Sequence, residues 1–471
     1  MISFGTGGWR HIIGDGFTKS NIQLLAAALC RKMQFEGNTE KGIVIGYDRR
    51  FLSKEAMRWL GTVFAAAGIK ARLVNESSPT PLIMYYVNQY DLPYGMMVTA
   101  SHNPAVYNGV KVFTAGGRDA DQTQTDEIER FASEIREEEI CDMDYNDAIE
   151  KGLIEEIYPI NEYLDDIISK IDMDTIRKAN LKIALDPLYG VSGTPMKILL
   201  YTARCRVEVN HNEHDTLFAG KAPTPTYGTM KSLADRVKDY NFDIGVAMDG
   251  DADRLGVIDD TGRYLHPNEI LVLLYYYLNH YRHIHGPAVR NISTTHILDK
   301  IARRFGEECY EVPVGFKWVS SKMAETGAII GGESSGGLTV KGHIHGKDGI
   351  YAAMLLIEMI AVSGKKLSQL FENIEEEYGS AYMEQREYSL THQKKEELSS
   401  LLFEEKVLPV LPYSVEKVSY MDGMKEYFEE GGWISVRFSG TEPLLRIFCE
   451  METQEKAEEI CNLFEAFLGL A

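Results

Sequence analysis

Three aspartates stand at alternate positions in the segment DGDADR, residues 249–254. The apolar run FDIGVAM before it and LGVID after it are typical of strands, so we expect a loop between two strands. Residues two apart in extended backbone face the same side, so Asp249, Asp251 and Asp253 can converge on one cation. Carboxylate oxygens favour Mg²⁺ or Ca²⁺ over softer metals. The alternative interpretation is a solvated acidic turn.

An EF-hand loop is the obvious competitor for this acidic segment. It would need glycine at its sixth position and glutamate at its twelfth. Arg254 and Asp260 occupy those positions here, which excludes the EF-hand.

A second candidate segment is MMVTASHNPAVYNGVKVF, in which Ser101 follows a strand-like run that ends at Thr99. Asn103 and Pro104 predict a turn directly after it. The residues alone leave open whether the serine is a nucleophile, a phosphate ligand or a helix cap. His102 is a poor candidate for its base, because adjacent residues of an extended chain point apart.

Lys111 belongs to YNGVKVF, which we expect to form the following strand. A lysine inside an apolar strand-like run is more often an edge residue than a catalyst. Its importance therefore depends on which residues surround it.

The segment GGESSGGLTVKGHIHGKDG, residues 331–349, contains seven glycines. Such a loop brings its backbone close to a ligand, and Glu333 and Ser335 offer groups that hydrogen-bond hydroxyls. We interpret it as a loop for polyol recognition. A flexible linker fits poorly, because charged and imidazole side chains are concentrated in it.

The segment RFSGTEPLLR, residues 437–446, is suited to binding an anion. Arg437 offers a forked guanidinium, Ser439 and Thr441 offer hydroxyls, and the backbone at Gly440 can form a nest. Arg446 follows on the next expected strand. The alternative is a surface turn with incidental arginines.

The elements that carry these segments show one repeated plan, in which an apolar strand is followed by a turn, a helix and a further short strand. The stretches are 42–74, 181–210 and 286–313. This alternation predicts three similar α/β domains with mixed sheets. WISVRF, LLRIFCEM and QEKAEEICNLFEAFLGL predict strand, strand and helix in a C-terminal α+β domain. The expected domains are residues 1–150, 151–255, 256–370 and 371–471.

Composition narrows the class of protein. The chain has 471 residues with 49 basic and 70 acidic side chains, a net charge of −21, which argues against nucleic-acid or anionic-membrane partners. The longest apolar run, residues 270–278, is too short to span a bilayer and predicts a buried helix. The six cysteines form no CxxC pair, which argues against a zinc site or a disulfide framework and indicates a reducing cytoplasm.

TASHNP, DGDADR, GESSG and RFSGTEP occur in this order between residues 99 and 443 and resemble the four signature loops of the α-D-phosphohexomutase superfamily, most closely its phosphoglucomutase/phosphomannomutase members. With GTGGWR near the N-terminus, the resemblance covers nearly the whole chain. It implies four domains around a central cleft and phosphoryl transfer between the 1- and 6-hydroxyls of a hexose. It also implies a phosphoserine, Mg²⁺, and a hexose 1,6-bisphosphate that serves as intermediate and activator.

The resemblance implies a role for each candidate residue. Lys111 is a candidate for proton transfer, and to act as a base at pH 7 it would need a lowered pKa, which nearby cations would supply. The implied metal ligands are Ser101, Asp249, Asp251 and Asp253. The implied catalytic residues are Ser101 as the phosphorylated serine, Arg10, Lys111, Arg254 and Lys347. The implied substrate-binding residues are His102, Lys317, Glu333, Ser335, Arg437, Ser439, Gly440, Thr441 and Arg446.

One difference from the sequence pattern of the superfamily indicates which subfamily the chain resembles. Relatives with a GExSGH loop carry histidine where this chain has Gly337, so the loop resembles instead the GEESGG…GHI…KDG form of phosphoglucomutases. That form points to Lys347 as a second catalytic lysine. Ser334 stands where that form often has glutamate, and the segment HIHGKDG differs from that form in the residues before Lys347. These two differences leave the sugar specificity open.

We therefore expect a cytoplasmic, Mg²⁺-dependent phosphohexomutase of carbohydrate metabolism that prefers glucose phosphates, with mannose phosphates as further candidates. It would act on small molecules as a monomer or homodimer. The alternatives are a phosphoglucosamine mutase or another sugar-phosphate mutase of the superfamily, a phosphatase that forms an aspartyl phosphate on Asp249 or Asp251, and a regulator that binds sugar phosphates without turnover.

Overall fold

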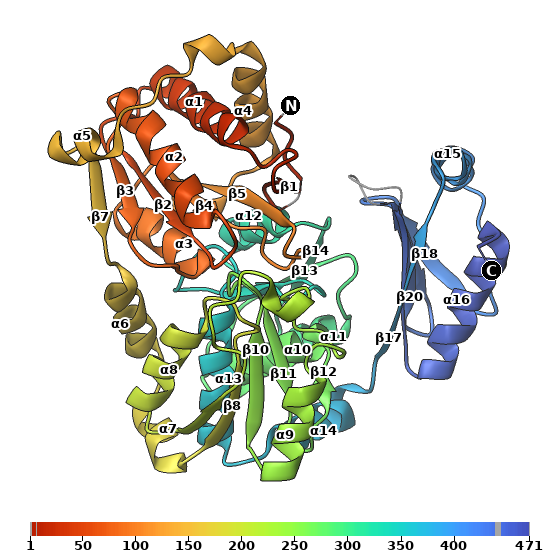
Figure 1. Cartoon of the computed structure of the whole chain (residues 1–471). Coiled ribbons are helices and arrows are strands. Elements are labelled where there is room, and N and C mark those ends of the chain that lie inside the picture. Colours follow the sequence, from red (N-terminus) through yellow and green to blue (C-terminus); the bar gives the residue numbers. More distant parts are fainter. Residues whose placement is uncertain (1, 6, 439–443, 471) are drawn as a thin grey trace. The chain divides into compact units, whose positions relative to one another are not determined.

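The computed structural model describes residues 2–5, 7–438 and 444–470. In this part of the chain the strands form four sheets flanked by helices (Figure 1). Three α/β domains precede an antiparallel α+β domain, so the predicted fold class is confirmed. The chain groups into two units, which we call the first unit, Met1–Ile270 with Ser335–Gln369, and the second unit, Leu271–Ser334 with Leu370–Ala471.

The first sheet has the strand order β1-β5-β4-β2-β3-β7, with β6 beside β5. It is parallel from β4 through β2 and β3 to β7, and antiparallel at β1, β5 and β6. Its strands are β1 (Trp9–Ile12), β2 (Ile43–Tyr47), β3 (Ala71–Val74), β4 (Tyr94–Val98), β5 (Tyr107–Thr114), β6 (Arg118–Asp119) and β7 (Ile154–Ile157). The helices of this domain are α1 (Lys19–Glu36), α2 (Ser53–Ala66), α3 (Thr80–Gln89), α4 (Gln122–Glu134) and α5 (Tyr145–Glu150).

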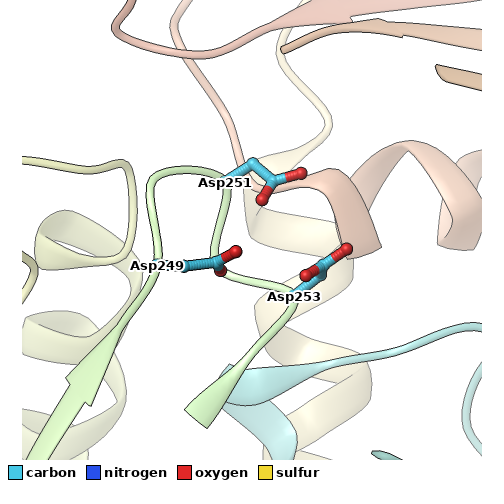
Figure 2. A group of neighbouring side chains, drawn as sticks. All are labelled: Asp249, Asp251 and Asp253. Carbon is cyan, nitrogen blue, oxygen red and sulfur yellow. The ribbon is translucent and has the colours of Figure 1, made fainter. Parts of the chain in front are cut away.

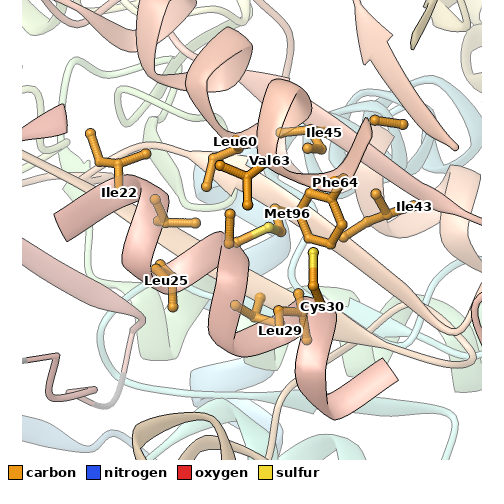
Figure 3. Close-up of a cluster of buried hydrophobic side chains, with 14 of the residues drawn as sticks. Ile22, Leu25, Leu29, Cys30, Ile43, Ile45, Leu60, Val63, Phe64 and Met96 are labelled. Carbon is orange, nitrogen blue, oxygen red and sulfur yellow. The ribbon is translucent and has the colours of Figure 1, made fainter. Parts of the chain in front are cut away.

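The core of this first domain lies between α1, α2 and the sheet (Figure 3). Ile22, Leu25 and Leu29 recur at helical spacing in α1 and are fully buried. The Thr18 hydroxyl caps the start of α1, and Gly37, with φ 67°, ends the helix. Each fully buried Leu or Ile side chain contributes about 1.5–3 kcal/mol, so this packing holds the strand ends that carry the site.

The second sheet has the order β12-β11-β10-β8-β9. Strands β10, β8 and β9 are parallel, whereas β11 and β12 return antiparallel. Its strands are β8 (Lys182–Asp186), β9 (Arg206–Val209), β10 (Ile244–Met248), β11 (Leu255–Ile258) and β12 (Tyr264–Leu265). Helices α6 (Ile160–Lys170), α7 (Met173–Ala179), α8 (Gly193–Thr202), α9 (Lys231–Tyr240) and α13 (Gly349–Ser363) belong to the same unit of the chain, as does β16 (Leu338–Val340).

In the second unit, β13 (Ala288–Asn291) pairs in parallel with β14 (Cys309–Val312) and β15 (Ile330–Gly332). Helices α11 (Ile297–Arg304) and α12 (Phe316–Thr326) follow β13 and β14. The apolar run at 270–278 is a buried part of α10 (Pro267–His280), as predicted. None of the helices in the described ranges has the length and apolar character needed to cross a membrane.

The C-terminal sheet is antiparallel throughout, in the order β17-β21-β20-β19-β18. The expected strands β20 (Trp433–Phe438) and β21 (Leu444–Met451) and the helix α16 (Gln454–Leu468) are present. Strand β17 (Tyr382–Ser389) was not predicted from the sequence, because its segment is strongly polar and only partly buried. The remaining elements are α14 (Leu367–Tyr378), α15 (His392–Ser399), β18 (Val415–Ser419) and β19 (Met424–Phe428).

Candidate active site

The carboxylates of DGDADR form one cluster. The segment is a loop between β10 and antiparallel β11, as predicted. One oxygen from each of Asp249, Asp251 and Asp253 lies within 4.8 Å of the others. All three side chains are buried and converge from the same loop (Figure 2). Three like charges in a buried space repel one another unless cations lie among them, so the surrounding groups decide the chemistry of the cluster.

Ser101 lies against this cluster. Its hydroxyl donates a 2.7 Å hydrogen bond to Oδ2 of Asp249. Its φ of 51° places it in a sharp turn beyond the end of β4, and no helix begins there, so the helix-cap alternative is wrong. Nδ1 of His102 lies 3.4 Å from the same hydroxyl. Burial, with the nearby Arg254 and Arg10, lowers the pKa of His102 and keeps its imidazole neutral.

Gly250 allows the metal-loop segment to approach the serine. A Cβ atom at this position would lie 2.6 Å from the carbonyl oxygen of Ser101. That distance is too short for any side chain, because the facing atom belongs to the backbone. The glycine of DGDADR therefore sets the closeness of the two loops.

A buried arginine that the sequence analysis did not select holds the serine loop. Nη2 of Arg50 donates hydrogen bonds to the carbonyl oxygens of Ser101, at 2.7 Å, and Asn103, at 2.6 Å. Nη1 donates to those of Pro104, at 2.9 Å, and Tyr107, at 3.0 Å. A guanidinium with four backbone acceptors fixes the shape of the turn. The only sequence signal was the position of Arg50 just after a buried strand.

Asp48 extends this support from the other side. Its carboxylate pairs with Nε of Arg50 at 3.4 Å and accepts hydrogen bonds from the hydroxyls of Thr99, at 2.6 Å, and Ser53, at 2.9 Å. Thr99 in turn accepts a 2.8 Å hydrogen bond from the backbone amide of Ser101. The serine is thus held through both its backbone amide and its carbonyl.

Lys111 projects into the carboxylate cluster from the interior strand β5, which lies between β1 and β4. The edge-residue interpretation is therefore wrong. Its Nζ lies 2.7 Å from Oδ2 of Asp251 and 2.6 Å from Oδ2 of Asp253. Burial alone would lower the pKa of Lys111, but the two carboxylates outweigh it and raise the pKa. The expected lowering of this pKa is not found, and the ammonium is a charged donor in this arrangement.

Lys347 reaches the same cluster, with its Nζ 2.9 Å from Oδ2 of Asp253. Gly337 makes room for it, because a Cβ atom there would lie 2.2 Å from Cδ of Lys347. Gly337 also forms an isolated antiparallel bridge with Arg254. The presence of glycine rather than histidine at position 337 therefore has a physical consequence, since it leaves room for the side chain of Lys347 to reach Asp253.

The cations around the cluster lie closer to some of the three aspartates than to others. Burial, followed by the charges of Asp251 and Asp253, raises the pKa of Asp249 to about 8. Burial also disfavours ionisation of Asp253, but Lys111 and Lys347 outweigh it and hold the pKa of Asp253 well below its usual range. The carboxyl group nearest Ser101 is thus the one that most lacks a cation.

The donor set fits a hard divalent cation. Oδ1 of Asp251 and Oδ1 of Asp253 are buried and have no hydrogen-bond partner, although buried carboxylate oxygens normally have one. Oxygen ligands of this kind suit Mg²⁺. Thr80, which the sequence analysis missed, donates a 2.5 Å hydrogen bond to Oδ2 of Asp251 and orients its carboxylate.

Two predicted arginines lie in the same unit. Nη1 of Arg10, in β1, donates a 2.6 Å hydrogen bond to Oδ1 of Asn103 in the serine loop. The backbone amide of Arg254 donates a 3.1 Å hydrogen bond to Oδ1 of Asp249, and its Nε lies 3.9 Å from Oδ1 of Asp253. Both guanidinium groups therefore lie where they can attract an anion near Ser101.

The predicted sugar-binding residues are divided between the two units. Ser335 is exposed in the first unit. In the second unit, Oε1 of the buried Glu333 accepts a 2.9 Å hydrogen bond from the amide of Gly315, just before α12, the helix that carries Lys317. Asn291 donates a second hydrogen bond, of 3.2 Å, to the same oxygen. The structure thus joins Glu333 to the start of the Lys317 helix.

The predicted phosphate-binding segment is only partly described. Ser439, Gly440 and Thr441 lie outside the described residues. Nε of Arg437 donates a 2.9 Å hydrogen bond to Asp422, whose other carboxylate oxygen accepts a 2.8 Å hydrogen bond from the amide of Val314. Arg437 is thereby linked to the loop before α12. Nε of Arg446 lies 2.6 Å from Oε2 of Glu387 in the neighbouring strand β17.

Comparison with known families gives four matches in chain order. The models of domains I, II, III and IV of phosphoglucomutase/phosphomannomutase match residues 1–139, 161–262, 266–378 and 405–466. Together they cover most of the chain and include every one of the predicted site residues.

Curated relatives match over nearly their whole length. A phosphoglucomutase/phosphomannomutase of Thermococcus kodakarensis is 29% identical over 463 residues, which are 98% of this chain and 97% of the relative. A phosphoglucosamine/phosphogalactosamine mutase of Sulfurisphaera tokodaii is 28% identical over 471 residues, with 98% and 97% coverage. The crystal structure of a "putative phosphomannomutase" from Thermus thermophilus superposes with a TM-score of 0.85 at 28% identity and covers 99% of both chains.

Proposed function

Because this chain belongs to the phosphoglucomutase/phosphomannomutase family of the α-D-phosphohexomutase superfamily, we propose that it interconverts hexose 1-phosphates and hexose 6-phosphates, with glucose as the preferred sugar and mannose as a further substrate. The observation that carries the proposal is the hydrogen bond between Ser101 and Asp249 at the edge of a buried three-carboxylate cluster. A hydroxyl in this position is suited to carry a phosphoryl group beside a metal ion.

In the proposed cycle, a phosphoryl group on Oγ of Ser101 passes to the free hydroxyl of a hexose phosphate. The P–Oγ bond breaks as the new P–O bond to the sugar forms, and the proton of the sugar hydroxyl passes through groups of the site to Oγ of Ser101, which becomes a free hydroxyl. The resulting hexose 1,6-bisphosphate turns around, and its other phosphoryl group returns to Oγ of Ser101. Phosphoryl transfer of this kind depends mainly on positioning and on charge stabilisation.

The residues around Ser101 supply both requirements. Asp249, Asp251 and Asp253, with the phosphate of Ser101, would hold Mg²⁺, which when bound neutralises charge on the phosphoryl oxygens. Lys111 and Lys347, which both contact the carboxylates, bring positive charge to the same place. We assign Lys111 the role of a charged donor to phosphoryl or sugar oxygens.

The remaining predicted residues would recognise the substrate. We propose that Glu333 and Ser335 bind sugar hydroxyls, that His102 and Lys317 contact the sugar phosphate, and that the segment from Arg437 to Arg446 binds the phosphate that is not being transferred. Binding by forked guanidinium groups and hydroxyls suits either end of the sugar, because both phosphates present the same three oxygens.

The decisive experiment is an assay of the conversion of glucose 1-phosphate to glucose 6-phosphate with Mg²⁺ and catalytic glucose 1,6-bisphosphate. Mannose and glucosamine phosphates form parallel arms, because the matching relatives carry both kinds of name. We expect Ser101→Ala to abolish turnover, whereas the control Ser133→Ala, in the exposed part of α4, leaves it unchanged. Equal inactivity of wild type and Ser101→Ala on all three sugars would contradict the proposal.

The mass of the intact protein separates the mutase from the phosphatase alternative. A mutase carries an acid-stable phosphate on Ser101, whereas an aspartyl-phosphate enzyme would carry a labile acyl phosphate on Asp249 or Asp251 and release inorganic phosphate. Stabilisation by sugar phosphates without any turnover would instead favour a binding regulator.

A further inference from the structure

A cavity of about 890 Å³ lies in the first unit, and none of the residues assigned to the reaction lines it. It opens where the parallel strands β2, β3 and β7 end, and the last residue of each strand, Tyr47, Val74 and Ile157, lines it. Ligands of α/β proteins commonly bind outside the carboxyl ends of parallel strands. The volume is that of an ordinary small-molecule site.

Four helices begin at this cavity. The residues before α2, α3 and α6, which are Leu52, Pro79 and Pro159, line it, as does Thr194 in the first turn of α8. In none of the four does a side chain cap the first turn. The first-turn amides of a helix have no partner within the helix, and each helix start carries about half a positive charge. Several uncapped helix starts around one cavity therefore produce a positive potential inside it.

Ser78 gives an independent sign that the cavity takes a ligand. This serine lines the cavity and is only 4% exposed, yet its hydroxyl has no hydrogen-bond partner. A buried hydroxyl without a partner is energetically unfavourable, so such groups are rare unless a ligand or water satisfies them.

Two basic side chains add to the positive potential. Arg49 is partly buried, and Nη1 donates a 2.9 Å hydrogen bond to the carbonyl oxygen of Asn212. Lys54 lies in the first turn of α2. Within the described ranges, neither cation has a carboxylate within ion-pair distance. Three acidic residues also line the cavity. Glu55 and Glu76 are exposed, so water screens them more than it screens the helix starts, whereas the charge of the buried Asp48 is paired with Arg50 at 3.4 Å.

From these observations we propose that the cavity is an anion site for a phosphate group, either free inorganic phosphate or the phosphate of a small ester. The hydroxyl of Ser78, the ammonium of Lys54 and the first-turn amides of α2, α6 and α8 supply the donors that phosphate oxygens require. The first turn of α3 adds no donor, because Thr80 and Leu82 already donate to carbonyl oxygens and Pro81 has no N–H. This inference stands whether or not the protein is a phosphohexomutase.

The site has a direct connection to the serine loop. Asp48 and Arg50 line the cavity, and these two residues hold the backbone on both sides of Ser101. A ligand in the cavity would therefore lie beside the residues that fix the position of the serine.

Equilibrium dialysis with radiolabelled inorganic phosphate tests the proposal. We expect the wild type to bind one more phosphate per chain than Lys54→Glu, because the reversed charge repels the anion. Ser78→Ala should weaken the same site about tenfold through loss of one charge-assisted hydrogen bond. The matched controls are Lys231→Glu, on the exposed surface of α9, and Ser435→Ala, another buried serine without a hydrogen-bond partner. Both controls should bind like the wild type.

Two results would overturn the inference. One is an equal number of phosphate sites in the wild type, Lys54→Glu and Ser78→Ala. The other is density in the cavity of phosphate-soaked crystals without any difference in dialysis, which would show an adventitious ion only. Competition with glucose 6-phosphate identifies the source of the phosphate: preferential displacement from the Lys54-dependent site indicates an ester, and its absence indicates free phosphate.

Discussion

The hydroxyl of Ser101 donates a 2.7 Å hydrogen bond to Asp249, although 148 positions separate the two residues in the chain. One stands beyond β4 of the first sheet and the other at the end of β10 of the second. The contact brings the predicted phosphate carrier to the carboxylate whose pKa is the highest of the three predicted metal ligands. A cation at this point would reduce the repulsion among the three carboxylates and would also neutralise charge on a phosphoryl group at Ser101.

Asparagine at Asp249 tests the metal site. Asp249→Asn keeps the shape and one acceptor but removes a ligand charge, so we expect Mg²⁺ to lose its stabilising effect on thermal unfolding. Turnover should fall by about 10²-fold or more. Differential scanning calorimetry in EDTA and in Mg²⁺, together with the mutase assay, measures both effects.

The control for this experiment is Asp235→Asn, on the exposed face of α9. It should keep the full response to Mg²⁺. A metal response of Asp249→Asn that equals that of the wild type would rule out the metal-ligand role.

The substitution Gly337→Ala tests whether glycine at this position lets Lys347 reach the carboxylate cluster. A Cβ atom at position 337 would lie 2.2 Å from Cδ of Lys347, so the lysine side chain must shift, and we expect its contact with Asp253 to weaken. The backbone of Gly337 is not left-handed, so we expect a loss of kcat of about tenfold or more with little change in stability. Steady-state kinetics and thermal unfolding separate the two effects. Gly228→Ala, where a Cβ meets open space, is the matched control, and equal kcat in both variants would refute the argument.

Lysine at Arg50 tests the support of the serine loop. A single ammonium cannot reach four carbonyl oxygens, so buried acceptors lose their partners and the free energy of unfolding should fall by about 2–3 kcal/mol. Because Arg50 acts through the position of Ser101, kcat should fall while KM changes little. Arg130→Lys, on the exposed surface of α4, serves as the control. A variant that loses stability but keeps full kcat would limit Arg50 to a structural role.

From the burial of Glu426 we predict that the stability of the C-terminal domain depends on pH. This residue of β19 is 1% exposed, and burial raises its pKa from 4.5 to about 7. The folded state therefore binds the proton more tightly than the unfolded state, and stability falls as the pH rises from about 4.5 to about 7. The contribution amounts to at most about 3 kcal/mol. Glu426→Gln should remove this part of the slope in urea unfolding measured across that range, and an unchanged slope would contradict the assignment.

Much of the fold follows from local patterns. The three strand–helix–strand stretches, the buried helix at 270–278 and the C-terminal strands were all predictable, because period and apolar content are properties of neighbouring residues. The polar strand β17 was not, since it forms by pairing with β21 rather than by burial of its own side chains.

The same division applies to the candidate site. The sequence by itself determined the residue types and their spacing. It contains alternate aspartates at the end of a strand, a serine in a turn, and glycines where backbones approach one another. It also contains two lysines that are far in the chain from the aspartates. Only the tertiary structure decided which charges meet. Lys111 acquired a raised pKa from two carboxylates 140 and 142 positions away, and Arg50 and Thr80 became supports of the site through contacts with distant segments. Electrostatic energy depends on distance in space and on burial, and neither is encoded in the local pattern that a sequence displays.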